Sequence, residues 1–484
     1  MPDIDGLVAE IEAGPQGPEV GAFFDFDGTL IDGYSAAIYF KERITSRQVG
    51  ARELLNTIVE TVNVEARGQD VSRLMDIGLG ALAGKQVIEI DAFGQRLFHT
   101  KIAKKIFPDA RVLLEAHRAA GHTIVMASSA TRFQTAAAAE DLGIEHTLVT
   151  EAEEDDAGLL TGRVRGPILW GPGKAAAVKE FAAEHGIDLA RSYAYGNGGE
   201  DVLYLEVVGH PRPLNPDDEL LAVARERGWP IARLTKVQRH TPVRIARTGA
   251  AFASLGVGLA AGVGLGLVNR DRGTALSVAA TVGSELALAA ADVRLEVWGQ
   301  ENLWRERPAV FAFNHQSQLD VLILAALLRT DFTAVAKKEL KSDPVFAAMG
   351  WLADVAYVDR ANTAAAKAAL APAVDSLKSG RSLVIAPEGT RSATPRLLPF
   401  KKGAFHLAMQ AGVPMVPIVI RNAGELMPAH SVFLGSGTID VAVLPPVSTK
   451  GWTTKNLDRK VEKVRGMFLS TLADWPATPP EPLT

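Results

Sequence analysis

Residues 21–30 read GAFFDFDGTL, a short apolar run that ends in two aspartates, a glycine and a threonine. The apolar part predicts a buried β-strand, and Gly28-Thr29 predicts a tight turn directly after it. Side chains alternate along a strand, so Asp25 and Asp27 should lie on the same side, at the strand's carboxyl end. In α/β sheets this end faces the ligand-binding crevice. Two carboxylates there can hold Mg²⁺ and divide the roles of nucleophile and general acid/base.

Further polar motifs follow later apolar runs: Ser128 after 123–127, Lys174 in the GPGK of 171–174, and Asn197 and Asp201 after 193–196. With the aspartate pair, they resemble the haloacid-dehalogenase (HAD) superfamily, in particular its phosphoserine-phosphatase-like branch. The resemblance implies a Rossmann-like α/β domain over residues 20–230. It also implies a helical cap over about 34–110 that closes over a phosphorylated substrate.

The same resemblance implies the role of each motif residue. Asp25 is expected to be the phosphorylated nucleophile and Asp27 the general acid/base, while Ser128 and Lys174 hold phosphoryl oxygens. The Mg²⁺ ligands would be Asp25, Asp27, Asn197 and Asp201. Asn197 departs from the family pattern, because an aspartate is expected there. An amide oxygen can bind Mg²⁺ but brings no negative charge, so we expect weaker metal binding.

A second set of motifs begins at residues 310–320, which read VFAFNHQSQLD. Four more apolar runs, at 332–335, 355–358, 383–385 and 412–420, are predicted to be strands, and polar residues follow the first three. In a parallel sheet such ends gather on one edge, which would bring together His315, Asp320, Arg360, Glu388 and Arg391. His315 can act as a general base oriented by Asp320, and the substrate's own hydroxyl can attack. Arg360, Arg391 and a lysine at 337 or 338 would bind a dianionic phosphate.

Four ordered motifs here resemble the glycerolipid acyltransferase family, which includes the 1-acylglycerol-3-phosphate acyltransferases: NHQSxxD at 314–320, YVDR at 357–360, PEGTRS at 387–392 and VPxVP at 413–417. The resemblance implies an α/β domain over 295–475 that moves an acyl group from acyl-CoA or acyl-carrier protein to a lysophospholipid hydroxyl. With 1-acylglycerol-3-phosphate the product would be phosphatidic acid. Substrate-binding residues would be Lys337, Lys338, Arg360, Glu388, Gly389, Thr390 and Arg391.

Residues 231–294 differ in composition from both flanking regions. A basic stretch precedes an uncharged segment, 248–268, and a second apolar segment follows at 274–293. We interpret the two as a helical hairpin that lies on or enters a membrane, the alternative being a buried hairpin in a soluble core. Small residues recur every four positions, at Gly258, Gly262 and Gly266 among others. This stripe predicts a close helix–helix contact, and we expect it to form a homodimer.

Composition limits the remaining possibilities. The chain has 484 residues, a formal net charge of −5 and no cysteine. The charge argues against a nucleic-acid partner, and the lack of cysteine excludes disulfides, cysteine nucleophiles and Cys-ligated zinc. Residues 1–5 lack the apolar core of a secretory signal, so the cytoplasm is the expected compartment. The basic residues before Thr248 and the expected use of acyl-CoA favour peripheral or monotopic attachment to the cytoplasmic face of the cell membrane.

Two alternatives to a bifunctional acyltransferase and phosphatase remain at the level of sequence. Asn197 favours an acyltransferase whose HAD domain is a non-catalytic scaffold or sensor. The other alternative is a phosphatase whose second half only binds lipid, which the intact pair His315 and Asp320 disfavours.

Overall fold

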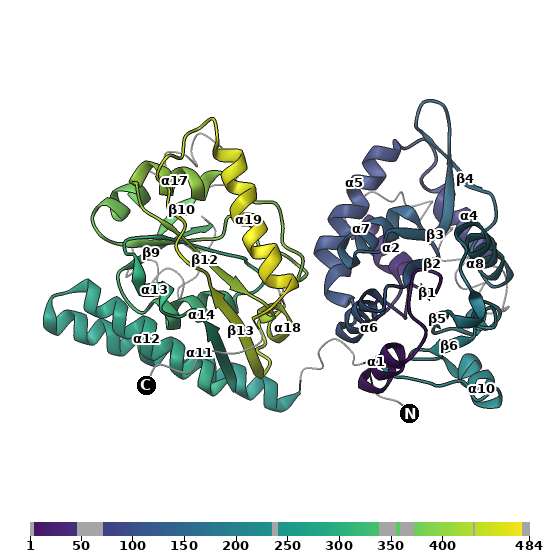
Figure 1. The fold of residues 1–484 in the computed structure, drawn as a ribbon, viewed down its shortest axis with the longest axis horizontal. Coiled ribbons are helices and arrows are strands. Elements are labelled where there is room, and N and C mark those ends of the chain that lie inside the picture. Colours follow the sequence, from purple (N-terminus) through teal and green to yellow (C-terminus); the bar gives the residue numbers. More distant parts are fainter. Residues whose placement is uncertain are drawn as a thin grey trace. The chain divides into compact units, whose positions relative to one another are not determined.

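The computed structural model describes residues 4–45, 71–234, 241–337, 355–358, 372–428 and 431–476. The chain divides into two compact units, residues 1–239 and 240–484 (Figure 1). Each unit is built around its own sheet, and each is described separately below.

The first unit contains a six-stranded sheet in the order β4-β3-β2-β1-β5-β6. All neighbours pair in parallel except β3 and β4, which are antiparallel. The first strand, predicted from residues 21–24, lies at the centre, between the strand that contains Ser128 and the strand that precedes Asn197. The strands are β1 (Gly21–Phe24), β2 (Thr123–Thr131), β3 (His146–Glu154), β4 (Leu160–Arg165), β5 (Tyr193–Gly196) and β6 (His210–Pro213).

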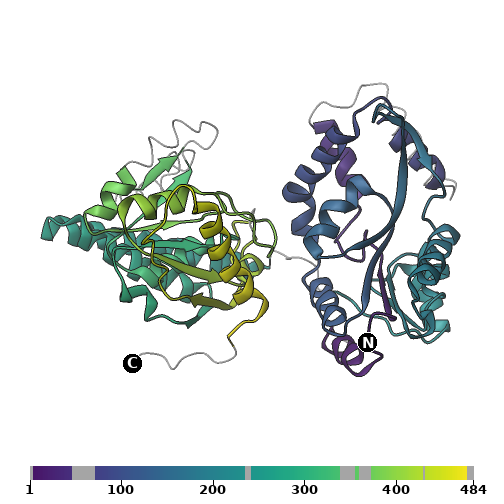
Figure 2. The same ribbon diagram turned by 45° about the horizontal axis from the view of Figure 1, so that its top comes forward.

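Helices cover both faces of this sheet, which gives the doubly wound α/β layering expected for residues 20–230 (Figures 1 and 2). The helices are α1 (Ile4–Ala13), α2 (Ser35–Thr45), α4 (Val71–Gly80), α5 (Val87–Leu97), α6 (Pro108–Ala119), α7 (Arg132–Leu142), α8 (Pro172–His185), α9 (Val202–Leu205) and α10 (Asp218–Glu226). Residues of α8, α9 and α10 pack with Phe23 and Val125 on one face. Helices α6 and α7 contact β2, and α6 carries His117 against Phe24 on the other face. The described part of the predicted cap, about 34–110, is mainly helical.

The second unit contains a seven-stranded sheet in the order β10-β9-β11-β8-β12-β13-β7. The five strands predicted from the apolar runs all pair in parallel with one another. Strand β13 pairs antiparallel with β12 and brings β7 to the edge, an addition that the motifs did not indicate. The strands are β7 (Val293–Trp298), β8 (Val310–Phe313), β9 (Phe332–Lys337), β10 (Ala356–Val358), β11 (Ser382–Ile385), β12 (Met415–Ile420) and β13 (Gly437–Val443).

Two hydrophobic layers enclose this sheet. On one face α11, α12 and α14 pack against the side chains of Phe311, Val384 and Val416. Side chains that alternate with these along the strands, such as Val310 and Leu383, point to the other face, where α17 and α19 pack against them. The helices are α11 (Pro242–Asn269), α12 (Arg272–Ala290), α13 (Asn302–Arg305), α14 (Leu319–Leu328), α17 (Gly403–Ala411), α18 (Ala423–Leu426) and α19 (Leu457–Ala473).

Helices α11 and α12 form the predicted hairpin and belong to the second unit (Figure 1). Among the described residues, these two helices are long and apolar enough to cross a membrane by length and composition alone. Helix α12 is partly buried against α14, whereas α11 exposes large apolar side chains, including Phe252, Val257, Leu267 and Val268.

The glycine stripe faces α12 of the same chain. A Cβ at Gly258 would lie 2.2 Å from the Cα of Gly283, and one at Gly262 would lie 2.4 Å from the carbonyl oxygen of Ala275. Gly266 likewise contacts Ala275. The prediction of a close helix–helix contact therefore holds within the hairpin. In this chain α12 covers the stripe, and the expected homodimer stays a prediction.

Candidate active sites

In the first unit, a buried lysine joins two of the predicted carboxylates. Lys174 Nζ donates to Asp25 Oδ1 at 2.8 Å and to Asp201 Oδ1 at 2.6 Å. Lys174 lies in the first turn of α8, while the two aspartates follow β1 and β5, which are neighbours in the sheet. Burial raises the pKa of Asp25 to about 7, although the ammonium of Lys174 acts in the opposite direction. Burial lowers the pKa of Lys174, but the charges of Asp201 and Asp25 outweigh it, so the net direction is upward.

Asn197 lies against the turn that follows the first aspartate. A Cβ at Gly28, where φ is +77°, would be 2.3 Å from Asn197 Nδ2, so only glycine lets the two segments approach this closely. Thr29 Oγ1 donates to Asn197 Oδ1 at 3.2 Å. The backbone N–H of Asn197 donates to Asp201 Oδ2 at 3.0 Å. Asn197 is therefore held against the turn at Gly28 and Thr29, with its amide oxygen already accepting one hydrogen bond.

The carboxylate of Asp27 is held by Ser35, the first residue of α2, at the start of the predicted cap. Ser35 donates to it twice, from the backbone N–H at 2.7 Å and from Oγ at 2.9 Å. Gln134 of α7 in turn donates to Ser35 Oγ at 3.2 Å. Burial raises the pKa of Asp27 to about 6, against the hydrogen bonds from Ser35. Ser35 was not among the predicted site residues; a serine at the start of a helix was the only sequence signal for it.

Ser128 lies buried in β2, next to β1, and accepts a hydrogen bond from the N–H of Ala130 at 3.2 Å. The structure thus brings together Asp25, Lys174 and Asp201 directly, with Asn197 tied to Asp201. The carboxylates of Asp27 and Asp201 are both occupied by protein hydrogen bonds. Among the described residues there is no cluster of three or more histidine or acidic side chains arranged to hold a metal.

In the second unit, His315 and Asp320 meet as predicted. His315 Nδ1 lies 2.8 Å from Asp320 Oδ2, which also accepts the backbone N–H groups of Gln316 and Ser317 at 2.8 Å each. Asp320 is fully buried in the first turn of α14, while the side chain of His315 is 21% exposed. Because a carboxylate only accepts, Nδ1 carries the proton and Nε2 is left as the basic nitrogen.

Glu388 connects the two loops that form this site. Its Oε1 accepts the backbone N–H of His315 and its Oε2 that of Leu398, each at 2.8 Å. It is 2% exposed, and burial raises its pKa to about 7. These contacts join Glu388 to the loop that carries His315. The expected binding of substrate by Glu388 stays a prediction.

The remaining predicted binding residues are only partly described. Gly389 has φ +72° and Arg391 is half-buried next to Asp320, whose charge opposes the lowering of the Arg391 pKa by burial. In the described part of the chain, Arg391 Nη1 and Asp320 Oδ1 are buried without a hydrogen-bond partner. Thr390 is exposed beside them. Lys337 ends β9, but its side chain lies outside the described residues, as do Lys338 and Arg360.

Three residues of the predicted motifs have roles that spacing did not reveal. The Asn314 side chain bonds both the N–H and the carbonyl of Ile420, at 2.7 Å each, and so joins the ends of β8 and β12. Ser317 Oγ donates to the carbonyl of Met427. The N–H of Ser392 donates to the carbonyl of His315 at 2.7 Å. These bonds fix the loop around His315 from three sides.

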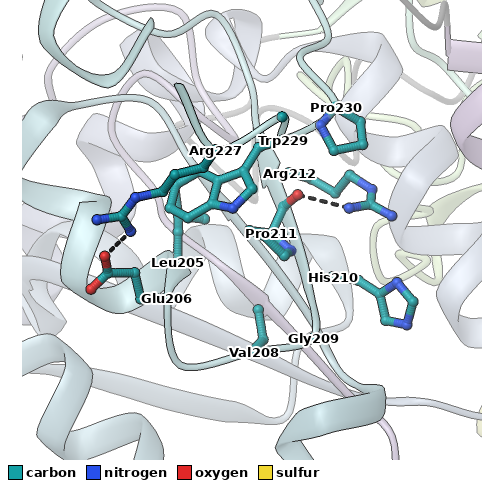
Figure 3. A pocket seen from close by; sticks show the side chains of 11 residues that line it. Leu205, Glu206, Val208, Gly209, His210, Pro211, Arg212, Arg227, Trp229 and Pro230 are labelled. Atoms are coloured by element: carbon teal, nitrogen blue, oxygen red, sulfur yellow. Dashed lines mark hydrogen bonds and ion pairs between the residues drawn. The ribbon is translucent and has the colours of Figure 1, made fainter. Parts of the chain in front are cut away.

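A separate pocket of about 600 Å³ lies beside β6 in the first unit (Figure 3). The guanidinium of Arg227 pairs with Glu206 and stacks on the ring of Trp229, 5.1 Å from its centroid. His210, at the amino end of β6, lines it as well. Since β6 runs parallel to β5, this pocket is at the end of the sheet opposite Asn197 and contains none of the predicted site residues.

The geometry defines a chain that joins two α/β domains of enzyme type, one with an Asp–Lys–Asp cluster and one with a His–Asp pair. A family model for haloacid dehalogenase-like hydrolases matches residues 22–206, and one for acyltransferases matches residues 294–421. The first half is 35% identical over 254 residues to phosphoserine phosphatase SerB1 of Mycobacterium tuberculosis, across 51% of this chain and 80% of that protein. The chain therefore belongs to the haloacid dehalogenase-like hydrolases and carries an acyltransferase domain C-terminal to the hydrolase domain.

Its second half is 38% identical over 187 residues to the 1-acyl-sn-glycerol-3-phosphate acyltransferase of Saccharomyces cerevisiae, across 37% of this chain and 60% of that protein. Among solved structures, the acyltransferase PlsC from Thermotoga maritima aligns with 49% of this chain and 98% of its own, at 21% identity and a TM-score of 0.42. The predicted combination of the two families is confirmed by the sequence matches.

Proposed function

We propose that the second unit transfers an acyl group from acyl-CoA to the free hydroxyl of 1-acylglycerol-3-phosphate, giving phosphatidic acid. The observation that carries this proposal is the bond between His315 Nδ1 and Asp320 Oδ2, which leaves Nε2 as a partly exposed base. The similarity to the yeast acyltransferase supports the choice of acceptor.

In the proposed reaction, His315 Nε2 removes the proton of the acceptor hydroxyl, and the oxygen attacks the thioester carbonyl. The C–O bond forms, the C–S bond breaks, and the leaving thiolate takes the proton back from the imidazolium. Asp320 stabilises the transient positive charge and holds the ring in one tautomer. Glu388 and Asn314 hold the backbone of the loop that carries His315 in place through hydrogen bonds.

Release of CoA tests this proposal with a low background, because the chain contains no cysteine and a thiol-reactive dye therefore reports only CoA. Purified full-length protein is given lysophosphatidate and acyl-CoA, and dye colour and lipid products are followed together. His315→Ala should lower the rate by about 10²–10⁴-fold, as expected for loss of a general base. A variant that retains the wild-type rate would exclude this mechanism.

We propose in addition that the first unit hydrolyses a phosphomonoester with Mg²⁺. The cluster of Asp25, Lys174 and Asp201 supports this, since a buried ammonium next to the nucleophile can hold a phosphoryl oxygen. The donor set fits the metal in part. Asp25 and Asn197 follow the neighbouring strands β1 and β5 and can each offer an oxygen, whereas Asp27 and Asp201 are held by other protein groups.

Mg²⁺ held by Asp25 and Asn197 would shield the charge between the nucleophile and the phosphate. In the proposed steps, a carboxylate oxygen of Asp25 attacks phosphorus while Asp27 protonates the leaving oxygen. A water then attacks phosphorus and gives a proton to Asp27, which regenerates Asp25. Lysophosphatidate and phosphatidate are the substrates to test first, because the neighbouring domain is proposed to handle both.

Release of inorganic phosphate distinguishes a phosphatase from a scaffold. The protein is assayed with Mg²⁺ and either lysophosphatidate or phosphatidate, and Asp25→Asn serves as the inactive control. Phosphate release that Asp25→Asn abolishes supports catalysis. Wild-type protein that releases no phosphate, while still releasing CoA in the acyl-transfer assay, would favour the scaffold.

We propose finally that the hairpin attaches the second unit to the cytoplasmic face of a membrane through the exposed apolar side chains of α11. Phe252, Val257 and Val268 lie between 47% and 79% exposed, which is unusual for large apolar groups in a helix that faces water only. Flotation with anionic vesicles tests it: Val257→Glu and Val268→Glu together should release the protein from the vesicles. Unchanged flotation of this double variant would contradict attachment by this face.

A further inference from the structure

A lysine outside the predicted site lies over the loop that carries Glu388 and Arg391. The chain around Lys401 runs alongside residues 387–389. The N–H of Lys401 donates to the carbonyl of Pro387 at 2.8 Å, and the N–H of Leu398 donates to the carboxylate of Glu388. The backbone at Lys401 is therefore fixed relative to the loop that positions His315. Its location does not depend on a flexible surface segment.

The side chain of Lys401 occupies the space that glycine leaves at position 389. A Cβ there would lie 2.9 Å from Lys401 Cδ and 3.0 Å from Nζ. Gly389 also has φ +72°, a conformation that other residues adopt only with strain. The glycine of the PEGTRS motif thus provides room for the ammonium group, directly next to Glu388 and two residues before Arg391.

The ammonium group of Lys401 has no ion-pair partner in the part of the chain that the structure describes. The nearest acidic residue along the loop, Glu388, is buried and accepts hydrogen bonds from two backbone N–H groups. By contrast, the adjacent Lys402 pairs with Asp458 of α19 at 2.6 Å. Both lysines are exposed, but Lys402 pairs with an aspartate, whereas Lys401 lies over the catalytic loop without an ion-pair partner among the described residues.

We propose that Lys401 binds a phosphate group of a substrate, together with Arg391, whose Nη1 is buried without a hydrogen-bond partner among the described residues. This inference rests on the proposed acyl transfer. A phosphate group is present on both substrates, as the phosphomonoester of the acceptor and as the phosphates of CoA. An ammonium and a guanidinium that both belong to this loop region suit either one.

The test compares Lys401→Met with Lys402→Met. Methionine keeps the unbranched stem that packs over Gly389 and removes the charge, and both variants lose the same net charge. Lys401→Met should raise the KM for one substrate about tenfold with little change in kcat, as expected for a lost charge-assisted hydrogen bond. Lys402→Met should leave both KM values unchanged, and Lys401→Arg should restore the wild-type KM.

Substrates without phosphate identify which group is bound. If Lys401 binds the acceptor phosphate, Lys401→Met and wild type should use monoacylglycerol equally well. If it binds CoA, the two proteins should use acyl-pantetheine equally well. A lower kcat with both KM values unchanged would overturn the proposal and leave Lys401 a structural residue.

Equilibrium binding separates this inference from the proposed reaction. Calorimetric titration with lysophosphatidate and with CoA needs no turnover. If the wild-type protein binds either ligand more tightly than Lys401→Met but releases no CoA in the assay, only the acyl-transfer proposal fails. If both ligands bind the two proteins equally, Lys401 has no role in binding phosphate, whatever the reaction.

Discussion

Glu388→Gln separates a positioning role from substrate binding at the acyltransferase site. The wild-type carboxylate accepts one backbone N–H at each oxygen, from His315 and from Leu398. An amide has a single acceptor oxygen, so the variant must point its NH₂ group at one of these two N–H donors. Either the His315 loop or the Leu398 segment then loses its anchor.

The magnitude follows from this lost contact. A hydrogen bond to a charged group contributes roughly 1.5–3 kcal/mol, and misplacing a catalytic group by about 1 Å can lower the rate about 100-fold. We therefore expect kcat to fall about 10- to 100-fold with KM nearly unchanged. The effect on unfolding should be smaller, because burial raises the pKa of Glu388 to about 7 and the ionised carboxylate is itself unfavourable there.

The assay is CoA release under saturating and limiting lysophosphatidate, with thermal unfolding measured on the same samples. Glu306→Gln, at an exposed glutamate of the same unit, is the matched control and should match wild type. A rise in the KM for lysophosphatidate with kcat intact would refute the reasoning, since that result requires Glu388 to touch the substrate.

Three further predictions concern other parts of the chain. Gly262→Ile should destabilise the second unit by about 3 kcal/mol, because its side chain would meet the backbone of α12. Gly264→Ile should not, because a Cβ there meets nothing within 4 Å, and urea unfolding compares the two variants. Asn197→Asp should lower the Mg²⁺ concentration needed for phosphate release roughly tenfold, because it adds a carboxylate ligand, and an unchanged Mg²⁺ titration would argue against metal binding at this position. Burial lowers the pKa of His117 well below its usual value, so the folded first unit binds fewer protons than the unfolded chain, and its stability should fall as the pH drops below about 6.5. His117→Asn should show a shallower loss between pH 7.5 and 5.5, and a slope equal to wild type would contradict this assignment.

Much of both sheets could be predicted because short apolar runs end in polar motifs. Residues 21–24 and 310–313 are fully buried central strands, and the residues directly after them carry the chemistry. The meeting of His315 with Asp320 also followed from local spacing, since both lie in one loop and the helix turn behind it.

Contacts between distant segments were the part that the sequence did not reveal. Ser35 reaches Asp27 only because α2 begins beside the strand end, and Lys401 reaches Gly389 only because two loops run side by side. The stripe at Gly258 and Gly262 correctly indicated close helix packing. Spacing alone, however, cannot tell a partner helix in the same chain from one in another copy.

The position of α12 bears on which part of the hairpin could be changed without disturbing the second unit. This helix packs against α11 through glycine and alanine, and against α14, whose first turn carries Asp320, through residues such as Ala287 and Leu288. Removing residues 242–290 would therefore uncover the core behind the catalytic loop. The outward face of α11 contributes little to that core, so its apolar side chains can be exchanged for polar ones while the length of the hairpin is kept.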